Sequence, residues 1–290
     1  MKFANPKTDF TFKRLFGNEH RKNLTIDFLN NLLERRAGNL ITHITFCENA
    51  NIPTAETEKV TYLDISCVDQ LEHHFIIEMQ VAKEASFLQR SQYYAAFALS
   101  NQLKKGDLYN KLQPVIFVGI MNELLFSKNK SAITHHLICD MDTHEQSLKH
   151  LEFHYVELNN FHKKLNQLDT NIDKWLYFLK KADSLETIPQ EFASSKEFKE
   201  AFHVLEQSLW TSAEKKAYLK SLDAINRDIR LQEGMIEAGE IKGRQKEKED
   251  VAINLLKMNI DTAIISQSTG LSIEQINEIS QELKTKSKKE

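Results

Sequence analysis

Two neighbouring stretches, Lys59–Asp69 (KVTYLDISCVD) and His73–Ala82 (HHFIIEMQVA), decide the fold of this chain. Both are rich in β-branched and aromatic residues, which predicts two strands joined by a short hairpin connection. Residues directly opposite each other in an antiparallel pair share a face, with Cβ atoms about 4.5–5.5 Å apart. A hairpin centred on Leu71 therefore places Asp64 opposite Glu78.

The facing carboxylates Asp64 and Glu78 predict a metal site. Two carboxylates so placed repel each other unless a positive charge lies between them, and a divalent cation supplies that charge. Mg²⁺ prefers one or two carboxylates together with waters and substrate phosphate oxygens. Alternate side chains of a strand share a face, so Gln80 points the same way as Glu78. The alternative is a face that simply meets water, and a register slip of one residue would separate the two acids.

The elements around this hairpin predict an α/β fold, with a mixed sheet flanked by helices in a core over residues 1–160. In chain order they are a helical region over Asp9–Arg36 that breaks at Gly17 and Asn18, a strand over Ile41–Cys47, the two hairpin strands, a helix over Ala85–Lys105 ended by Gly106, a strand buried on both faces over Pro114–Met121, and a last strand near Leu151–Leu158.

The remainder of the chain is predicted to be all-helical. We expect a helical extension packed on the core over residues 161–230, then a charged, easily bent helical linker and a short tail that resembles a helix-turn-helix over residues 231–290. Gly270 makes the turn of that tail and Ser272 caps its second helix. The second helix (SIEQINEIS) has two Glu and no Lys or Arg. This composition favours packing or homo-oligomer formation over insertion into a DNA groove.

Composition limits the class of protein. The chain has 290 residues, of which 41% are hydrophobic and 27% charged, so it is too apolar to be disordered. The formal net charge of −3 excludes a strongly basic protein that coats nucleic acid. The three cysteines lack metal-ligand spacing, which favours a reducing compartment. The longest apolar run is about half the ~18 residues that span a bilayer, and the N-terminus has no apolar signal region. We expect a cytoplasmic protein without membrane contact.

Several motifs together resemble one family. The segments TDFTFKRLFGNEHRKNLTIDFLNNLL, EKVTYLDISCVD, HHFIIEMQ, RSQYY and QLKKGDLYNKLQPVIFVGI follow one another over residues 8–160 in the order found in the Rpn family of recombination-promoting nucleases and transposases. That family belongs to the PD-(D/E)XK nuclease superfamily. The resemblance implies a restriction-endonuclease-like core of one helix, three strands, a helix and a strand, and it implies hydrolysis of DNA phosphodiester bonds.

The resemblance also implies roles for four residues of the hairpin. The metal-binding Asp and Glu of the family match Asp64 and Glu78, which would hold Mg²⁺ (or Mn²⁺ or another divalent cation) with the backbone carbonyl of Met79. The Lys that is usual in the superfamily is replaced by Gln80, as in the family's EMQ signature. A neutral Gln orients water by hydrogen bonding but does not carry charge, so more of the catalysis would fall on the metal.

Further residues are candidates for the substrate-binding cleft. Arg90 and Tyr93 match a family Arg and Tyr near the site, and an Arg can grip a phosphate with two hydrogen bonds. The alternative is an Arg that lies along the surface. Asp9 and Lys13 match the family's DFxFK motif, and they either line the cleft or form a surface ion pair of little weight. The sequence also has two pairs of adjacent histidines, at residues 73–74 and 135–136. They are not predicted to bind metal, because neighbouring residues of a strand face opposite ways.

The function expected from these residues is that of a Mg²⁺-dependent DNA endonuclease acting in recombination or transposition. Two alternatives stay open. One is a catalytically inactive DNA-binding or assembly protein that keeps the nuclease fold. The other is an RNA-directed nuclease, because no residue singled out here recognises deoxyribose.

Overall fold

The chain forms two compact units, Met1–Asn226 and Arg227–Glu290, in the computed structural model. The structure describes residues 3–47, 50–51, 61–62, 64–82, 84–126 and 131–286. The α-helices among them are α1 (Asp9–Phe16), α2 (Lys22–Leu32), α3 (Phe87–Ser100), α4 (Asn171–Lys181), α5 (Lys196–Leu205), α6 (Ser212–Lys257), α7 (Thr262–Thr269) and α8 (Ile273–Lys286). The strands are β1 (Ile44–Phe46), β2 (Ala50–Asn51), β3 (Thr61–Tyr62), β4 (Ile65–Asp69), β5 (His74–Gln80), β6 (Val115–Met121), β7 (Ile133–Ile138) and β8 (Leu148–Glu157).

A six-stranded mixed sheet is the base of the first unit. Its strand order is β1-β4-β5-β6-β8-β7, and a separate pair is formed by β2 and β3. Strands β5, β6 and β8 run parallel to one another, whereas the other neighbouring pairs of the large sheet are antiparallel. The sheet is flanked by helices, so the predicted α/β class with a mixed sheet between helices is confirmed.

The register of the central hairpin is the predicted one. In the β4–β5 pair, Ile65 lies opposite Ile77 and Cys67 opposite Phe75, which is the register of a hairpin centred on Leu71. All four of these paired side chains are buried. The alternation of apolar residues therefore favours this register, because a slip of one residue would move this whole set to the opposite face of the sheet.

The predicted strand over residues 59–69 is divided in the structure. Thr61 and Tyr62 form β3, which pairs with β2, and β4 begins only at Ile65 after a bend at Asp64. Residues 59, 60 and 63 lie outside the described part of the chain. The bend takes Asp64 out of the regular ladder and leaves it at the end of β4.

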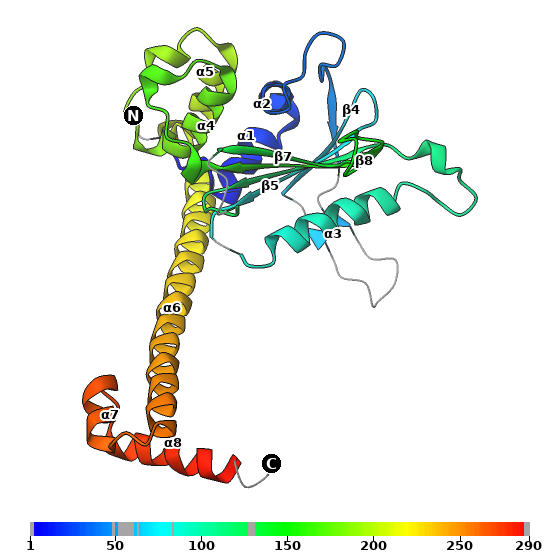
Figure 1. Ribbon diagram of the computed structural model, residues 1–290. Coiled ribbons are helices and arrows are strands. Elements are labelled where there is room, and N and C mark those ends of the chain that lie inside the picture. The colour runs from blue at the N-terminus through cyan, green and yellow to red at the C-terminus, as the bar shows by residue number, and fades with distance from the viewer. Residues whose placement is uncertain are drawn as a thin grey trace. The chain divides into compact units, whose positions relative to one another are not determined.

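Helices cover both faces of the sheet (Figure 1). One face packs on α1, α2, α4 and α5 through the larger core, in which Phe75, Val118 and Trp175 are fully buried. The other face packs on α3 through a smaller core that includes Phe87 and Phe117. Glu78 and Gln80 alternate with the residues of the larger core, so they lie on the face that α3 covers.

Two predicted boundaries of the first unit have different outcomes. The helical break at Gly17 is confirmed, because Gly17 caps α1 and donates its N–H to the carbonyl of Lys13. The helix predicted over Ala85–Lys105 was expected to end at Gly106. This prediction is wrong, since the helix found there, α3, ends at Ser100. The chain turns directly after Asn101, and Gly106 lies in a later turn with φ of +96°.

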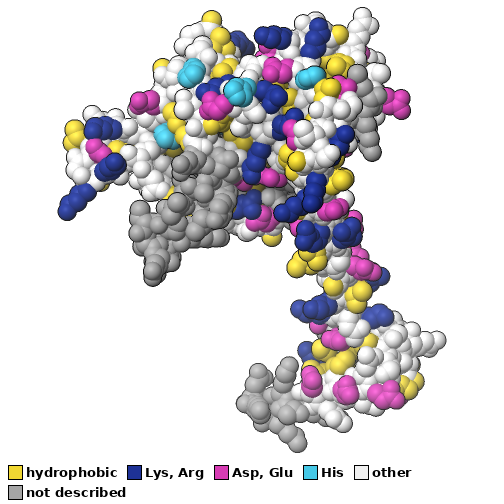
Figure 2. All heavy atoms as spheres, turned by 180° about the vertical axis from the view of Figure 1, so that it is seen from behind, with side chains coloured by type: hydrophobic (Ala, Val, Ile, Leu, Met, Phe, Trp, Pro, Cys, Tyr) yellow, Lys and Arg dark blue, Asp and Glu magenta, His cyan; other side chains and the backbone are white. Residues whose placement is uncertain are grey.

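Helix α6 is one continuous element of 46 residues. It runs through three glycines in the stretch predicted as an easily bent linker, and a Cβ at any of these three positions would meet nothing within 4 Å. Charged side chains of both signs alternate with hydrophobic ones along this helix (Figure 2). Among the described helices, none has an apolar stretch long enough to cross a bilayer.

The second unit contains a small helical hairpin. Gly270 ends α7 in the left-handed conformation at φ +69°, and the Ser272 hydroxyl accepts a hydrogen bond from the N–H of Gln275 at the start of α8. The predicted turn and N-cap are thus confirmed. Ile265 and Ile276 are buried against Ala252 of α6, so the hairpin has its own apolar core.

Candidate active site

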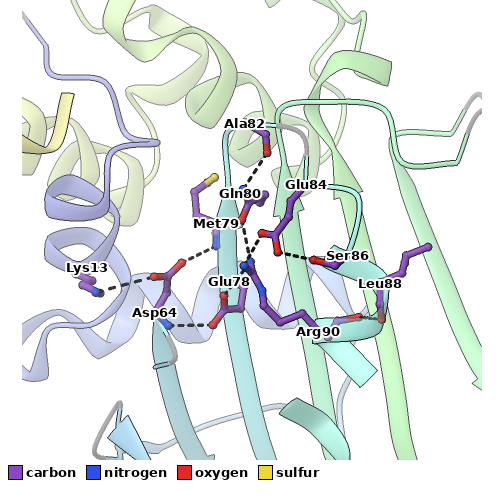
Figure 3. A network of polar contacts seen from close by, with 11 residues as sticks. Lys13, Asp64, Glu78, Met79, Gln80, Ala82, Glu84, Ser86, Leu88 and Arg90 are labelled. Carbon is purple, nitrogen blue, oxygen red and sulfur yellow. Dashed lines mark hydrogen bonds and ion pairs between the residues drawn. The ribbon is translucent and has the colours of Figure 1, made fainter. Parts of the chain in front are cut away.

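Asp64 and Glu78 are joined through the backbone of the hairpin (Figure 3). The N–H of Asp64 donates to Glu78 Oε1 at 3.1 Å, and the N–H of Met79 donates to Asp64 Oδ2 at 2.9 Å. Each carboxylate is therefore oriented by a main-chain donor close to the other acid. The structure brings together the two side chains that the hairpin register predicts to face each other.

Burial and mutual repulsion make this pair electrostatically unfavourable without a cation. Glu78 is only 6% exposed, and burial, followed by the negative charge of Asp64, raises its pKa to about 8. Burial also raises the pKa of Asp64. The interpretation of a solvated acidic face is wrong for Glu78, because α3 covers this face of the sheet.

Two cationic side chains lie beside the carboxylates, at distances longer than a direct hydrogen bond. Lys13 Nζ is 3.9 Å from Asp64 Oδ1, and Arg90 Nη2 is 3.9 Å from Glu78 Oε2. Both distances exceed the 2.7–2.9 Å of a charge-assisted hydrogen bond. The nearest carboxylate to Lys13 is that of Asp9, with Nζ at 2.7 Å from Oδ1. Lys13 of α1 therefore lies between Asp9 and Asp64, and the side chain of Asp9 is the more exposed of the Asp9–Lys13 pair.

Arg90 of α3 connects the end of β5 to the loop that follows it. Its Nη2 donates to Gln80 Oε1 at 2.8 Å, and its Nη1 pairs with Glu84. The Gln80 amide donates from Nε2 to the carbonyl of Ala82 at 2.9 Å. Gln80 is therefore held at both ends of its amide, on the same face as Glu78. The guanidinium also lies over the rings of Phe87 and Tyr94.

The structure adds Glu84 and Tyr94 to the predicted set. Glu84 lies six residues before Arg90, a separation that no helical or strand periodicity brings together, so sequence spacing gave no signal for it. Tyr94 has its ring centroid 5.9 Å from the Arg90 guanidinium carbon. Tyr93 is 44% exposed and stacks on Phe97 at 6.0 Å. A substrate-binding role for Tyr93 stays a prediction.

The chemistry of the donor set fits a small hard cation. Two acids on neighbouring segments supply anionic oxygens, and Met79 directs its N–H toward Asp64. The N–H and C=O of one strand residue point to the same side, so the Met79 carbonyl is directed to that side as well. Within the described ranges, no group of three or more His, Cys, Asp or Glu side chains is arranged to hold a metal. Mg²⁺ binding through two carboxylates, a carbonyl and water does not require such a group.

Fold and site together define an α/β core of PD-(D/E)XK type with two acids at the edge of neighbouring strands. A family model described as PD-(D/E)XK nuclease family transposase matches residues 6–233. The chain belongs to this family. Membership implies a nuclease, a hydrolase of nucleic acid related to transposition. No curated protein and no solved structure matched the chain in the other two comparisons.

Proposed function

We propose that this protein is a Mg²⁺-dependent DNA endonuclease in which Asp64, Glu78 and the carbonyl of Met79 hold the metal. The observation that carries this proposal is the pairing of the buried Glu78 with the partly exposed Asp64, whose N–H donates to Glu78 Oε1 at 3.1 Å. Burial raises the pKa of both acids, so a bound cation would favour their ionised forms. When bound, a divalent cation neutralises phosphate charge and lowers the pKa of an attacking water.

The residues around the carboxylates have proposed supporting roles. Arg90 holds the Gln80 side chain, so that Gln80 orients the attacking water by hydrogen bonding. Because Arg90 also has Glu78 at 3.9 Å, it offsets part of that acid's charge. A phosphate oxygen that displaces Glu84 from Nη1 would keep the guanidinium paired. Lys13 offsets the charge of Asp64 from the α1 side.

The residues of the site also predict how metal binding depends on pH. At neutral pH the raised pKa of Glu78 keeps a proton on the pair in the metal-free protein. Cation binding must displace that proton, because a coordinating carboxylate is deprotonated. We therefore propose that metal affinity rises with pH up to about the pKa of Glu78.

Self-association is proposed for the C-terminal helical region. Leu231 and Met235 of α6 are 63% and 77% exposed. Residues four apart share one face of a helix, so these two side chains form a small apolar patch. We assign a second copy of the chain to this patch. The resulting dimer would contain two candidate active sites.

Cleavage of supercoiled DNA tests the proposed activity. Wild type is expected to nick the DNA with Mg²⁺ and not with EDTA, and Asp64→Asn and Glu78→Gln should each lose at least about a hundredfold in rate. The matched control is Glu72→Gln, which removes one exposed carboxylate in the turn of the same hairpin. Folding of each variant is checked by circular dichroism.

Three results would contradict the assignment. Cleavage that persists in EDTA or in both site variants would refute these residues as the metal site. Cleavage of RNA but not of DNA would favour the RNA-directed nuclease. A folded wild type that binds DNA but never nicks it would favour the inactive DNA-binding protein.

A further inference from the structure

A cavity lies next to the carboxylate pair, at the carboxyl end of β5. Its volume is about 380 Å³, within the range of sites that hold small organic groups. Its walls are mostly apolar and come from the start of α3 and from the end of β6 with its following loop: Phe87, Leu88, Met121, Leu124 and Leu125. Gln80 forms part of the lining, and it stands two residues, about 7 Å, beyond Glu78 on the same face.

The cavity is built into the fold by a buried acid. Glu157, at the end of β8, is fully buried and accepts hydrogen bonds from the N–H groups of Leu125 and Phe126. At the other end of this loop, the N–H of Asn122 donates to the carbonyl of Gln80 at 3.1 Å. The described part of this loop, residues 122–126, is therefore held at each of its ends by hydrogen bonds from its main-chain N–H groups.

The polar groups of the lining determine what the cavity excludes. They are the carboxylates of Glu84 and Glu123 and the amide of Gln80, and no Lys or Arg belongs to the described lining. Because Glu84 is paired with Arg90, the carboxylate of Glu123 is the group of this lining that repels an anion. An apolar slot with acceptors at its edge suits an uncharged ring that has N–H groups. A nucleobase has both properties, and it reaches a site next to its own phosphate through one sugar.

We propose that this cavity receives one unpaired nucleobase of a DNA strand whose phosphate lies at Asp64 and Glu78. The proposal rests on the proposed nuclease function. A base inside a duplex is stacked and paired, so it must leave the stack to enter a cavity in the protein. The protein would then favour unpaired or easily unpaired DNA, and the base pocket would set which nucleotide borders the cut.

Binding of two labelled single strands of equal length tests the pocket without cleavage. One strand carries adenine at every position, and the other carries abasic sugars throughout. Fluorescence anisotropy in Mg²⁺ and low salt, on strands whose phosphorothioate linkages resist cleavage, measures both affinities. Wild type should bind the adenine strand about tenfold more tightly, since contact with one base typically changes affinity by this order.

Two variants at one position separate the pocket from other base contacts. Leu124→Trp fills the cavity from an exposed wall residue, and Leu124→Met keeps its volume. The preference for adenine should fall below twofold in Leu124→Trp and persist in Leu124→Met. Equal affinities in wild type, or an unchanged preference in Leu124→Trp, would overturn the pocket. Cleavage without base preference would refute the pocket alone, and preference without any cleavage would refute the nuclease alone.

Discussion

At the residue scale, main-chain N–H groups orient the two acids of the hairpin, and two cationic side chains stand farther off. Asp64 and Glu78 each accept a backbone N–H close to the other, while Lys13 and Arg90 stand 3.9 Å away. Burial raises the pKa of both acids, so a bound cation would stabilise their ionised forms. Such an arrangement costs stability in the metal-free protein and gains it back when a cation binds.

The sequence allowed part of this site to be predicted. Strand alternation and the position of Leu71 were enough to pair Asp64 with Glu78. The side-chain period of two excludes a slip of one residue, and the short turn centred on Leu71 excludes larger slips. Glu84 could not be predicted, since it lies in a connection where no period applies. Its pairing with Arg90 depends on how α3 docks on the sheet, which is a tertiary property.

The pH dependence of stability follows from the raised pKa of Glu78. The folded protein keeps a proton that the unfolded chain releases, because the pKa is about 8 in the folded state and 4.5 ordinarily. This contribution is fully present below pH 4.5 and is lost as pH rises through 8. Thermal unfolding in EDTA at matched pH values tests this. As pH rises from 4.5 to about 8, the melting temperature of wild type should fall relative to that of Glu78→Gln. Parallel melting curves for the two proteins at every pH would contradict the account.

At the element scale, the positions of most strands were predictable and their ends were not. The apolar run of β6 and the alternation of β4 and β5 were sufficient to place them. Strand β7 was not predicted: it pairs only with β8 at the edge of the sheet, and four of its six residues are exposed. An edge strand lacks the buried pattern that would signal it. The end of α3 was also not predictable: the helix ends at Ser100 in a turn that contains no glycine, six residues before Gly106.

Gly119 controls how closely α3 approaches the sheet opposite Glu78. A Cβ at this position would lie 2.9 Å from the ring of Tyr155 and 3.1 Å from that of Phe87. Gly119→Ala should therefore destabilise the protein by about 1–3 kcal/mol, as overpacking does, in a denaturant titration. The control is Gly234→Ala in α6, where a Cβ meets nothing within 4 Å and helix propensity should add up to about 1 kcal/mol of stability. Equal effects of the two substitutions would contradict this packing.

At the scale of the whole molecule, the chain consists of two compact units, and α6 contributes to both. The predicted division into a core over residues 1–160, an extension over 161–230 and a tail over 231–290 stays a proposal. The tail hairpin buries its own isoleucines, which supports packing over groove reading. The continuity of α6 was hard to predict because three glycines fall in it. Each costs about 1 kcal/mol, and the surrounding Glu, Lys, Arg and Ala residues favour the helix enough to offset that cost.

Self-association is the prediction at this scale. The double variant Leu231→Lys with Met235→Lys places two charges on the exposed patch of α6, and its mass in solution should fall to that of one chain by light scattering. The control is Glu233→Lys, an exposed position on the same helix that lies off the patch. A wild type that has the mass of one chain at every concentration would contradict the proposal, as would an unchanged mass of the double variant.

The most direct test of the central claim is Mn²⁺ binding measured by electron paramagnetic resonance, because it needs neither substrate nor turnover. The account predicts one bound ion per chain in wild type and in Glu72→Gln. It predicts at least about tenfold weaker binding in Asp64→Asn and in Glu78→Gln, since each variant removes one of two anionic ligands. Binding of equal strength in wild type and in both site variants would show that these two carboxylates do not hold the metal.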